Sequence, residues 1–224
     1  MYHPEYKKAL DSVRDLHKRY CLTVNPSVQD IRLALYYLQG GCITQAYFSL
    51  KAWGSGDLNG VMGSKRFIDE SKSLIFYLIL IEDASRYVRR FFQDEIVTIN
   101  PHKHKKDIMK RLEMDELTFN TWVKNEEKLR HGFSKGVHPT YRGSGYNSDQ
   151  DTGEFDYDAK NSIFGSILEF DFANFIIIPT IDSVAMTCGA FGIEQKDIPE
   201  VFEIRNKIQE MAIQYHKERK GVSR

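Results

Sequence analysis

The 224-residue chain has few cysteines, no surplus of either charge and no long apolar run. Its three cysteines, Cys21, Cys42 and Cys188, stand far apart and form no CxxC pair. That spacing excludes a disulfide framework and a zinc knuckle. The longest apolar run, Leu74 to Ile81, has eight residues, whereas a membrane-spanning helix needs about 20. The first residues hold no apolar signal core, so we predict a soluble cytoplasmic protein with no membrane association.

Charge is balanced, with 31 basic and 31 acidic residues. This balance argues against a protein that coats nucleic acid by bulk charge. Residues 99–142 are locally positive, with ten Lys/Arg and six Asp/Glu, which would suit a surface that faces RNA. The sequence has no Walker loop, no GxGxxG and no HExxH. It therefore predicts no ATP or dinucleotide chemistry, no cofactor and no metal site.

Two polar segments offer weaker alternatives. His102 and His104, with the lysines beside them, could bind a metal or a phosphate, but a single HxH in a loop is more often a solvated basic connector. Residues 147–158 place Asn and Asp at several positions of a calcium-loop template. Thr152 stands where that loop needs glycine, and Asp158 where it needs glutamate. An acidic exposed loop is the simpler interpretation.

Hydrophobic periodicity predicts helices throughout and no strand. The expected helices cover residues 4–22, 27–53, 65–93, 115–138, 159–188 and 197–218. We predict an all-α fold, a single bundle of about five to seven helices. Its core spans about residues 28–190, with flanking helices at 4–22 and 197–218.

Local signals refine this helical scheme. Ser27 and Asp30 resemble an N-cap and its third-residue acid. Gly40 and Gly41, in the middle of the second helix, mark either a kink or the close approach of another helix. The segment 54–64 is rich in glycine and is expected to be a loop. Pro179 should bend the helix that contains it.

The polar residues most suited to chemistry lie between Leu129 and Pro139. Arg130, Ser134 and His138 are spaced four apart, so on a helix they occupy neighbouring turns of one face. A half-buried histidine near an arginine can act as an acid or base near neutral pH. The structural alternative is that Ser134 and His138 hydrogen-bond to a neighbouring helix and fix its position.

This segment resembles the motif region of HEPN-like helical proteins, in particular a bacterial group with a Tyr-Arg-x-Leu-Ser-x-x-x-His-Pro signature. Its second half is similar to the stretch that contains Ser134, His138 and Pro139 here, with Phe133 in place of leucine. Arg66 and Glu70, just before the apolar run, resemble the same family's second core helix. The resemblance covers about residues 28–190.

The resemblance implies an activity as well as a fold. Many HEPN proteins are metal-independent ribonucleases of toxin–antitoxin and antiphage systems, with an Arg-x(4–6)-His motif at a homodimer interface. By this likeness Arg130 would hold the scissile phosphate and His138 would act as general acid or base, with Ser134 and His131 as binding residues. The implied partners are RNA, a second copy of the chain, and an antitoxin or defence protein.

The chain also departs from the family pattern. Seven residues separate Arg130 from His138, one more than the motif allows, and His131 occupies the position that would complete it. The asparagine that often follows the family's arginine is absent. Two expectations therefore stay open: an endoribonuclease, or a non-catalytic HEPN-type module for interaction or dimerisation. A third, weaker hypothesis is a bundle that binds a small nucleotide signal.

Overall fold

The protein is described by a computed structural model that covers residues 4–137 and 172–222. Within these residues the fold is all-α, with eight α-helices and no strand, which confirms the predicted class. The α-helices are α1 (Pro4–Cys21), α2 (Ile31–Gly54), α3 (Leu58–Leu80), α4 (Ser85–Phe92), α5 (Lys105–Arg111), α6 (Glu116–Val137), α9 (Ile178–Ala185) and α10 (Pro199–Val222). Shorter turns are η1 (Pro101–His104), η2 (Ala173–Ile177), η3 (Cys188–Phe191) and η4 (Gln195–Asp197).

The first two helices form an antiparallel pair close to the predicted bounds. Asp30, not Ser27, is the N-cap of α2, because its side chain accepts a hydrogen bond from the Leu33 amide at 2.9 Å. The two central glycines do not end this helix. A Cβ on Gly40 would lie 3.3 Å from the ring of His17 in α1. The glycines therefore serve the close approach of neighbouring helices.

The predicted loop at residues 54–64 is mostly helix. Asp57 caps α3, since its carboxylate accepts a hydrogen bond from the Gly60 amide at 2.9 Å. Gly56 lies in the turn before α3, with a φ of 79°, whereas Gly60 and Gly63 continue as helix because Val61 and Met62 between them are buried in the core. Tertiary burial thus overrides the low helical propensity of glycine at this point.

The single helix predicted over residues 65–93 is also wrong, because the chain leaves the helix at Ile81. Ile81 has an extended backbone, and Asp83 accepts a hydrogen bond from the Ser85 amide at 3.0 Å. Such a turn by an aspartate competes with helical bonding. The second piece, α4, therefore starts as a separate short helix.

A change of helix type marks the position of Pro179. The turn η2 is a π-helix, and it passes directly into α9, in which Pro179 occupies the first turn. Proline is tolerated there because the first amides of a helix lack an intrahelical acceptor. The sequence predicts a bend at this proline. The structure has a change from π- to α-helical hydrogen bonding there.

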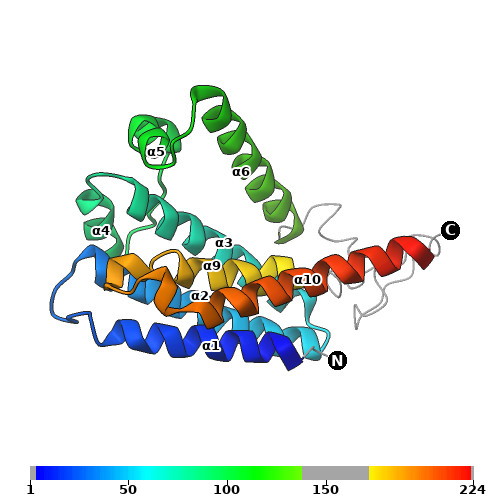
Figure 1. The fold of residues 1–224 in the computed structure, drawn as a ribbon. Helices are drawn as coiled ribbons and strands as arrows, with labels where there is room; N and C mark the ends of the chain where they lie inside the picture. The colour runs from blue at the N-terminus through cyan, green and yellow to red at the C-terminus, as the bar shows by residue number, and fades with distance from the viewer. Residues whose placement is uncertain (1–3, 138–171, 223–224) are drawn as a thin grey trace.

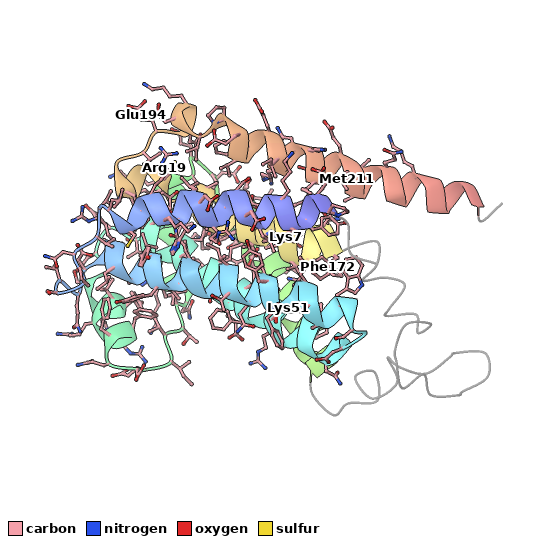
Figure 2. The ribbon with its side chains drawn as sticks, turned by 90° about the horizontal axis from the view of Figure 1, so that it is seen from below. Lys7, Arg19, Lys51, Phe172, Glu194 and Met211 are labelled. Atoms are coloured by element: carbon pink, nitrogen blue, oxygen red, sulfur yellow. The ribbon has the colours of Figure 1, made fainter. Side chains whose placement is uncertain are left out.

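Helices from both ends of the described chain share one core. Figure 1 shows α1, α2, α9 and α10 packed together, with α3 beside them and α5 and α6 on the far side of α3. Seen from below in Figure 2, α1 lies between α2 and α10. No helix of the described residues has the length and apolar character that a membrane crossing requires.

Candidate functional site

The first residues of the predicted polar stripe lie on the last turns of α6. Asp115 caps this helix, since its carboxylate accepts a hydrogen bond from the Thr118 amide at 2.7 Å. The helix then continues through Gly132 and Gly136 to Val137. The backbone positions of Arg130, His131 and Ser134 are therefore helical, and the spacing of four between Arg130 and Ser134 keeps them on adjacent turns.

The remaining predicted residues lie beyond what the structure describes. His138 and Pro139 are outside the described ranges, as is the calcium-like segment 147–158. The side chains of Arg130, His131 and Ser134 also fall outside the described set. The structure accordingly leaves the pairing of Arg130 with His138 as a prediction.

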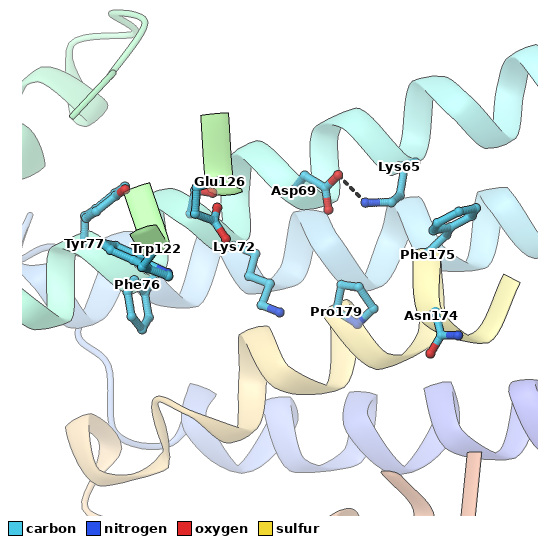
Figure 3. Close-up of a pocket in the computed structure, with 11 residues that line it drawn as sticks. Lys65, Asp69, Lys72, Phe76, Tyr77, Trp122, Glu126, Asn174, Phe175 and Pro179 are labelled. Atoms are coloured by element: carbon cyan, nitrogen blue, oxygen red, sulfur yellow. Dashed lines mark hydrogen bonds and ion pairs between the residues drawn. The ribbon is translucent and has the colours of Figure 1, made fainter. Parts of the chain in front are cut away.

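A cleft between α3, α6 and the η2–α9 segment lies immediately before this stripe. Its volume is about 450 Å³, and Figure 3 shows its walls. The lining residues are Lys65, Asp69, Lys72, Ser73, Phe76, Tyr77, Trp122, Glu126, Asn174, Phe175 and Pro179. Clefts of this size are typical of small-molecule and cofactor sites, which measure roughly 300–1,000 Å³.

A buried ion pair forms one end of the cleft. Lys65 is only 5% exposed, and its ammonium bonds to the carboxylate of Asp69, one turn further along α3. Burial lowers the pKa of Lys65 and raises the pKa of Asp69, while the opposite charge of each partner acts against those shifts. The Lys65 ammonium also lies 5.8 Å from the ring centroid of Phe175, so the pair is enclosed by apolar surface.

Lys72, in the middle of the cleft, shares a carboxylate with a second cation. The Lys72 ammonium lies 3.1 Å from Asp182 Oδ2, and Arg205 Nε lies 2.7 Å from the other oxygen of the same carboxylate. One carboxylate thus serves two cations from α3 and α10. With the carboxylate of Glu126, which also lines the cleft, the charges of Lys72, Arg205 and Asp182 sum to zero. Lys72 is partly exposed, so it can still meet a ligand.

Aromatic rings form the opposite end. The ring centroids of Phe76 and Trp122 are 5.7 Å apart with an interplanar angle of 55°, and Tyr77 lies 6.1 Å from Trp122. Trp122 also packs at 6.0 Å against Phe119, which is fully buried. These contacts hold the indole in place, and Figure 3 shows the three rings gathered at one side of the cleft.

Glu126 connects the cleft with the predicted stripe. It follows Trp122 by one turn of α6, lines the cleft and is half-buried. Its carboxylate also interacts electrostatically with Lys65. Position 130 lies one further turn along the same side of the helix, because each step of four residues rotates by about 40°. The stripe and the cleft therefore occupy consecutive turns of one helix.

The sequence reasoning did not identify this cleft. It singled out Arg66 and Glu70, which instead form an exposed ion pair at 2.8 Å on the surface of α3. The detectable signal was the set of polar residues Lys65, Asp69 and Lys72 at helical spacing, since these stand on the same side of an otherwise apolar helix.

The basic connector has a packing role. His104 Nε2 lies 2.7 Å from the hydroxyl of Tyr87, and the His102 ring lies 5.7 Å from that of Phe119. Across residues 4–137 and 172–222, no group of three or more potential His, Cys, Asp or Glu ligands could hold a metal ion. His104 is thus held by Tyr87, whereas His102 stays exposed, as expected of a solvated basic connector.

Comparisons with protein-family models, with curated proteins and with solved structures found no match to this chain.

Proposed function

We propose that this protein is a HEPN-like helical protein that acts on RNA as a metal-independent endoribonuclease. The observation that supports the proposal is the unbroken course of α6 to Val137, which keeps Arg130 and Ser134 on adjacent turns beside a cleft that Lys72 lines. An arginine at position 130 can attract an RNA phosphate. We place the protein in a cytoplasmic antiphage or toxin–antitoxin pathway, as a homodimer with an antitoxin or defence partner.

In the proposed reaction the nucleophile belongs to the substrate. The ribose 2′-oxygen attacks the adjacent phosphorus, its proton passes to a base, and the 5′-oxygen of the next nucleotide leaves with a proton from an acid. His138 takes the acid or base part, and Arg130 stabilises the charge that develops on the phosphate. His131 and Ser134 contact the phosphate or hold Arg130 and His138. Because the 2′-hydroxyl attacks directly, no metal-bound water is needed.

An RNA cleavage assay in EDTA tests this proposal. Wild type, His138→Ala and Arg130→Ala are each incubated with a pool of structured RNAs, after circular dichroism has shown that all are folded. Lys124→Ala is the matched control, since Lys124 is an exposed cation on the same helix outside the cleft. We expect cleavage by wild type and the control, with products that end in a 2′,3′-cyclic phosphate.

Loss of each proposed catalytic group should reduce the cleavage rate by about a hundredfold or more. Equal cleavage by His138→Ala and wild type would contradict the assignment. Absence of cleavage by any protein, together with a lower melting temperature for His138→Ala, would contradict the nuclease and favour the non-catalytic interaction or dimerisation module.

A further inference from the structure

We propose that the cleft between α3 and α6 binds a zwitterion, in particular a free α-amino acid with a large apolar side chain. The carboxylate of this ligand meets Lys72, its ammonium meets Glu126, and its side chain packs against Phe76 and Trp122. The volume of the cleft, about 450 Å³, is sufficient for a ligand of this size. The charge balance of the cleft, its two separate charged groups and its aromatic side each support this assignment.

The charged groups at the middle of the cleft cancel one another. Asp182 is shared by Lys72 and Arg205, and with Glu126 these charges sum to zero. A site without net charge gives no overall attraction to a ligand that carries an excess of either sign. A ligand with one charge of each sign, by contrast, can pair with a cation and with a carboxylate at the same time. The balance therefore favours a zwitterion.

Lys72 and Glu126 line the same cleft without pairing to each other. The Lys72 ammonium has three N–H donors, and its contact with Asp182 uses one of them. The carboxylate of Glu126 is half-buried and forms no hydrogen bond or ion pair with any other residue that the structure describes. Each of the two groups thus retains capacity for a ligand, and a zwitterion placed between them satisfies both.

Each of the two helices supplies one charged group and one ring at the same spacing. Lys72 and Phe76 are four residues apart on α3, and Trp122 and Glu126 are four residues apart on α6. Residues at this spacing lie about 6 Å apart along the axis on one face of a helix. Figure 3 shows the rings at one side of the cleft and the two charged side chains next to them. An α-amino acid has a matching layout, because its two charged groups and its side chain are attached to a single carbon.

The aromatic side of the cleft suits an apolar side chain. Phe76 and Trp122 meet at 55°, so their rings form a corner. Both side chains are only half-buried, so part of each ring remains available to a ligand. Tyr77 and Phe119 support the indole from the protein side. Burial of apolar surface against these rings therefore favours an amino acid with a large apolar side chain over glycine.

This inference goes beyond the proposed ribonuclease and does not require it. The residues that line the cleft do not include Arg130 or His138, and an amino acid takes no part in the cleavage of RNA. The cleft is thus a ligand site separate from the residues proposed for catalysis.

Calorimetry on the full chain tests the site directly. The main probes are L-phenylalanine and L-leucine. Three incomplete probes accompany them: phenethylamine lacks the carboxylate of phenylalanine, 3-phenylpropionate lacks its ammonium, and glycine lacks its side chain. We expect wild type to bind both apolar amino acids, and to bind each incomplete probe more weakly by about tenfold or more, since each has lost one contact.

Two substitutions separate the charged contacts. Lys72→Met removes the ammonium but keeps the length of the side chain, and Glu126→Gln removes only the charge. Lys72→Met should weaken the binding of L-phenylalanine by about tenfold and leave that of phenethylamine unchanged, because phenethylamine has no carboxylate to pair. Glu126→Gln should weaken L-phenylalanine similarly and leave 3-phenylpropionate unchanged, because 3-phenylpropionate has no ammonium.

Matched controls and a spectroscopic readout complete the test. Lys196→Met replaces an exposed lysine outside the cleft, and Glu127→Gln replaces an exposed glutamate next to Glu126 on α6. Both should bind L-phenylalanine as wild type does, and circular dichroism verifies that all variants are folded. The chain has two tryptophans, so Trp53→Phe leaves Trp122 as the sole indole, and its emission should change when L-phenylalanine or L-leucine binds.

Binding of L-phenylalanine or L-leucine, with this dependence on both charges, supports the proposal. The proposal is overturned if neither amino acid binds, or if any incomplete probe binds to wild type as tightly as L-phenylalanine. It is also overturned if either Lys72→Met or Glu126→Gln binds L-phenylalanine as wild type does. The comparison of probes on wild type decides the matter even where a variant does not fold. None of these outcomes depends on RNA cleavage.

Discussion

At the scale of single residues, several buried polar groups are paired with one another, although Gln39 Oε1 and Ser49 Oγ have no hydrogen-bond partner among the described residues. Lys65 and Asp69 are two ionisable groups one turn apart, and each compensates for the burial of the other. Gln39 donates from its side-chain amide to the Ser183 carbonyl at 3.1 Å and to the Thr187 hydroxyl. The contacts of Gln39 connect α2 with α9 and the residues after it, whereas the Lys65–Asp69 pair lies within α3.

His17 makes the stability of the fold depend on pH. Its ring stacks on Tyr36 at 4.3 Å, and its Nε2 donates to the Tyr36 carbonyl at 2.8 Å. Burial lowers the pKa of His17 below its ordinary value of 6.5, although the hydrogen bond acts in the other direction. Between the folded pKa and 6.5 the unfolded chain binds more protons, so stability is present above 6.5 and is lost as the pH falls.

We therefore expect the free energy of unfolding to decrease from pH 7.5 to pH 5, with part of the decrease due to His17. Urea unfolding at several pH values measures it. His17→Gln should show a shallower dependence than wild type, and His102→Gln, which replaces an exposed histidine, should not. An NMR titration that placed the pKa of His17 above 6.5 would contradict the expectation.

At the scale of helices, two kinds of glycine can be separated by what surrounds them. A Cβ on Gly63 in α3 would meet nothing within 4 Å, whereas a Cβ on Gly40 in α2 would lie 3.3 Å from the ring of His17. The His17 ring is itself held against Tyr36. Gly63 therefore lowers the stability of α3 and serves no close contact, whereas the packing of α1 against α2 requires glycine at position 40.

Substitution by alanine should separate the two positions. Gly63→Ala is expected to raise the free energy of unfolding by about 0.5–1 kcal/mol, because alanine restricts the unfolded chain and favours the helix. Gly40→Ala should not raise the free energy of unfolding by this amount, because the added methyl group would displace the His17 ring. Urea unfolding of both variants against wild type gives the comparison, and an equal gain at both positions would show that the α1–α2 approach is not tight.

Helix bounds were predictable where periodicity ended at a clear signal. The first helix matches, and so does the start of α10, because in each case an apolar stripe begins near a proline, Pro4 or Pro199. The end of α10 was predicted at residue 218, four residues before Val222. The break after Leu80 was missed, since the apolar run reaches the charged residues of α4 without a glycine or proline. The feature that marks this break is a local hydrogen bond, in which the Ser85 amide donates to the Asp83 carboxylate. Hydrophobic periodicity does not detect such a contact.

The candidate site was less predictable than the fold. The stripe on α6 follows from spacing along one helix, so the sequence shows it. The cleft joins Lys72 of α3, Trp122 of α6 and Asn174 of η2, which are far apart along the chain. Only the packing of three helices brings them together, and one sequence contains no direct signal of that packing.

At the scale of the whole molecule, α1 belongs to the same buried core as the central helices. Six of its side chains are buried in it: Tyr6, Ala9, Leu10, Val13, Leu16 and Tyr20. Tyr20 also donates a hydrogen bond to the Val184 carbonyl at 2.9 Å and stacks on Phe191 at 4.1 Å. The two ends of the chain are thus joined through α9 and η3. A core joined in this way should unfold as one cooperative unit.

The substitution Leu10→Ala tests whether α1 unfolds together with the rest of the core. Leu10 has no exposed surface, so its truncation should cost about 2–5 kcal/mol of unfolding free energy. Leu22→Ala is the control, since Leu22 lies just beyond α1 and is 88% exposed, and it should change the stability by less than about 0.5 kcal/mol. Tryptophan fluorescence and far-ultraviolet circular dichroism should give coincident urea transitions for both variants. A small loss for Leu10→Ala, or an early separate transition, would mean that α1 only flanks a core formed by the other helices. A large loss of unfolding free energy in a single transition would show that the first 21 residues are needed to hold α9 and α10 in place. Because α9 forms one wall of the cleft, these residues would then also hold that wall.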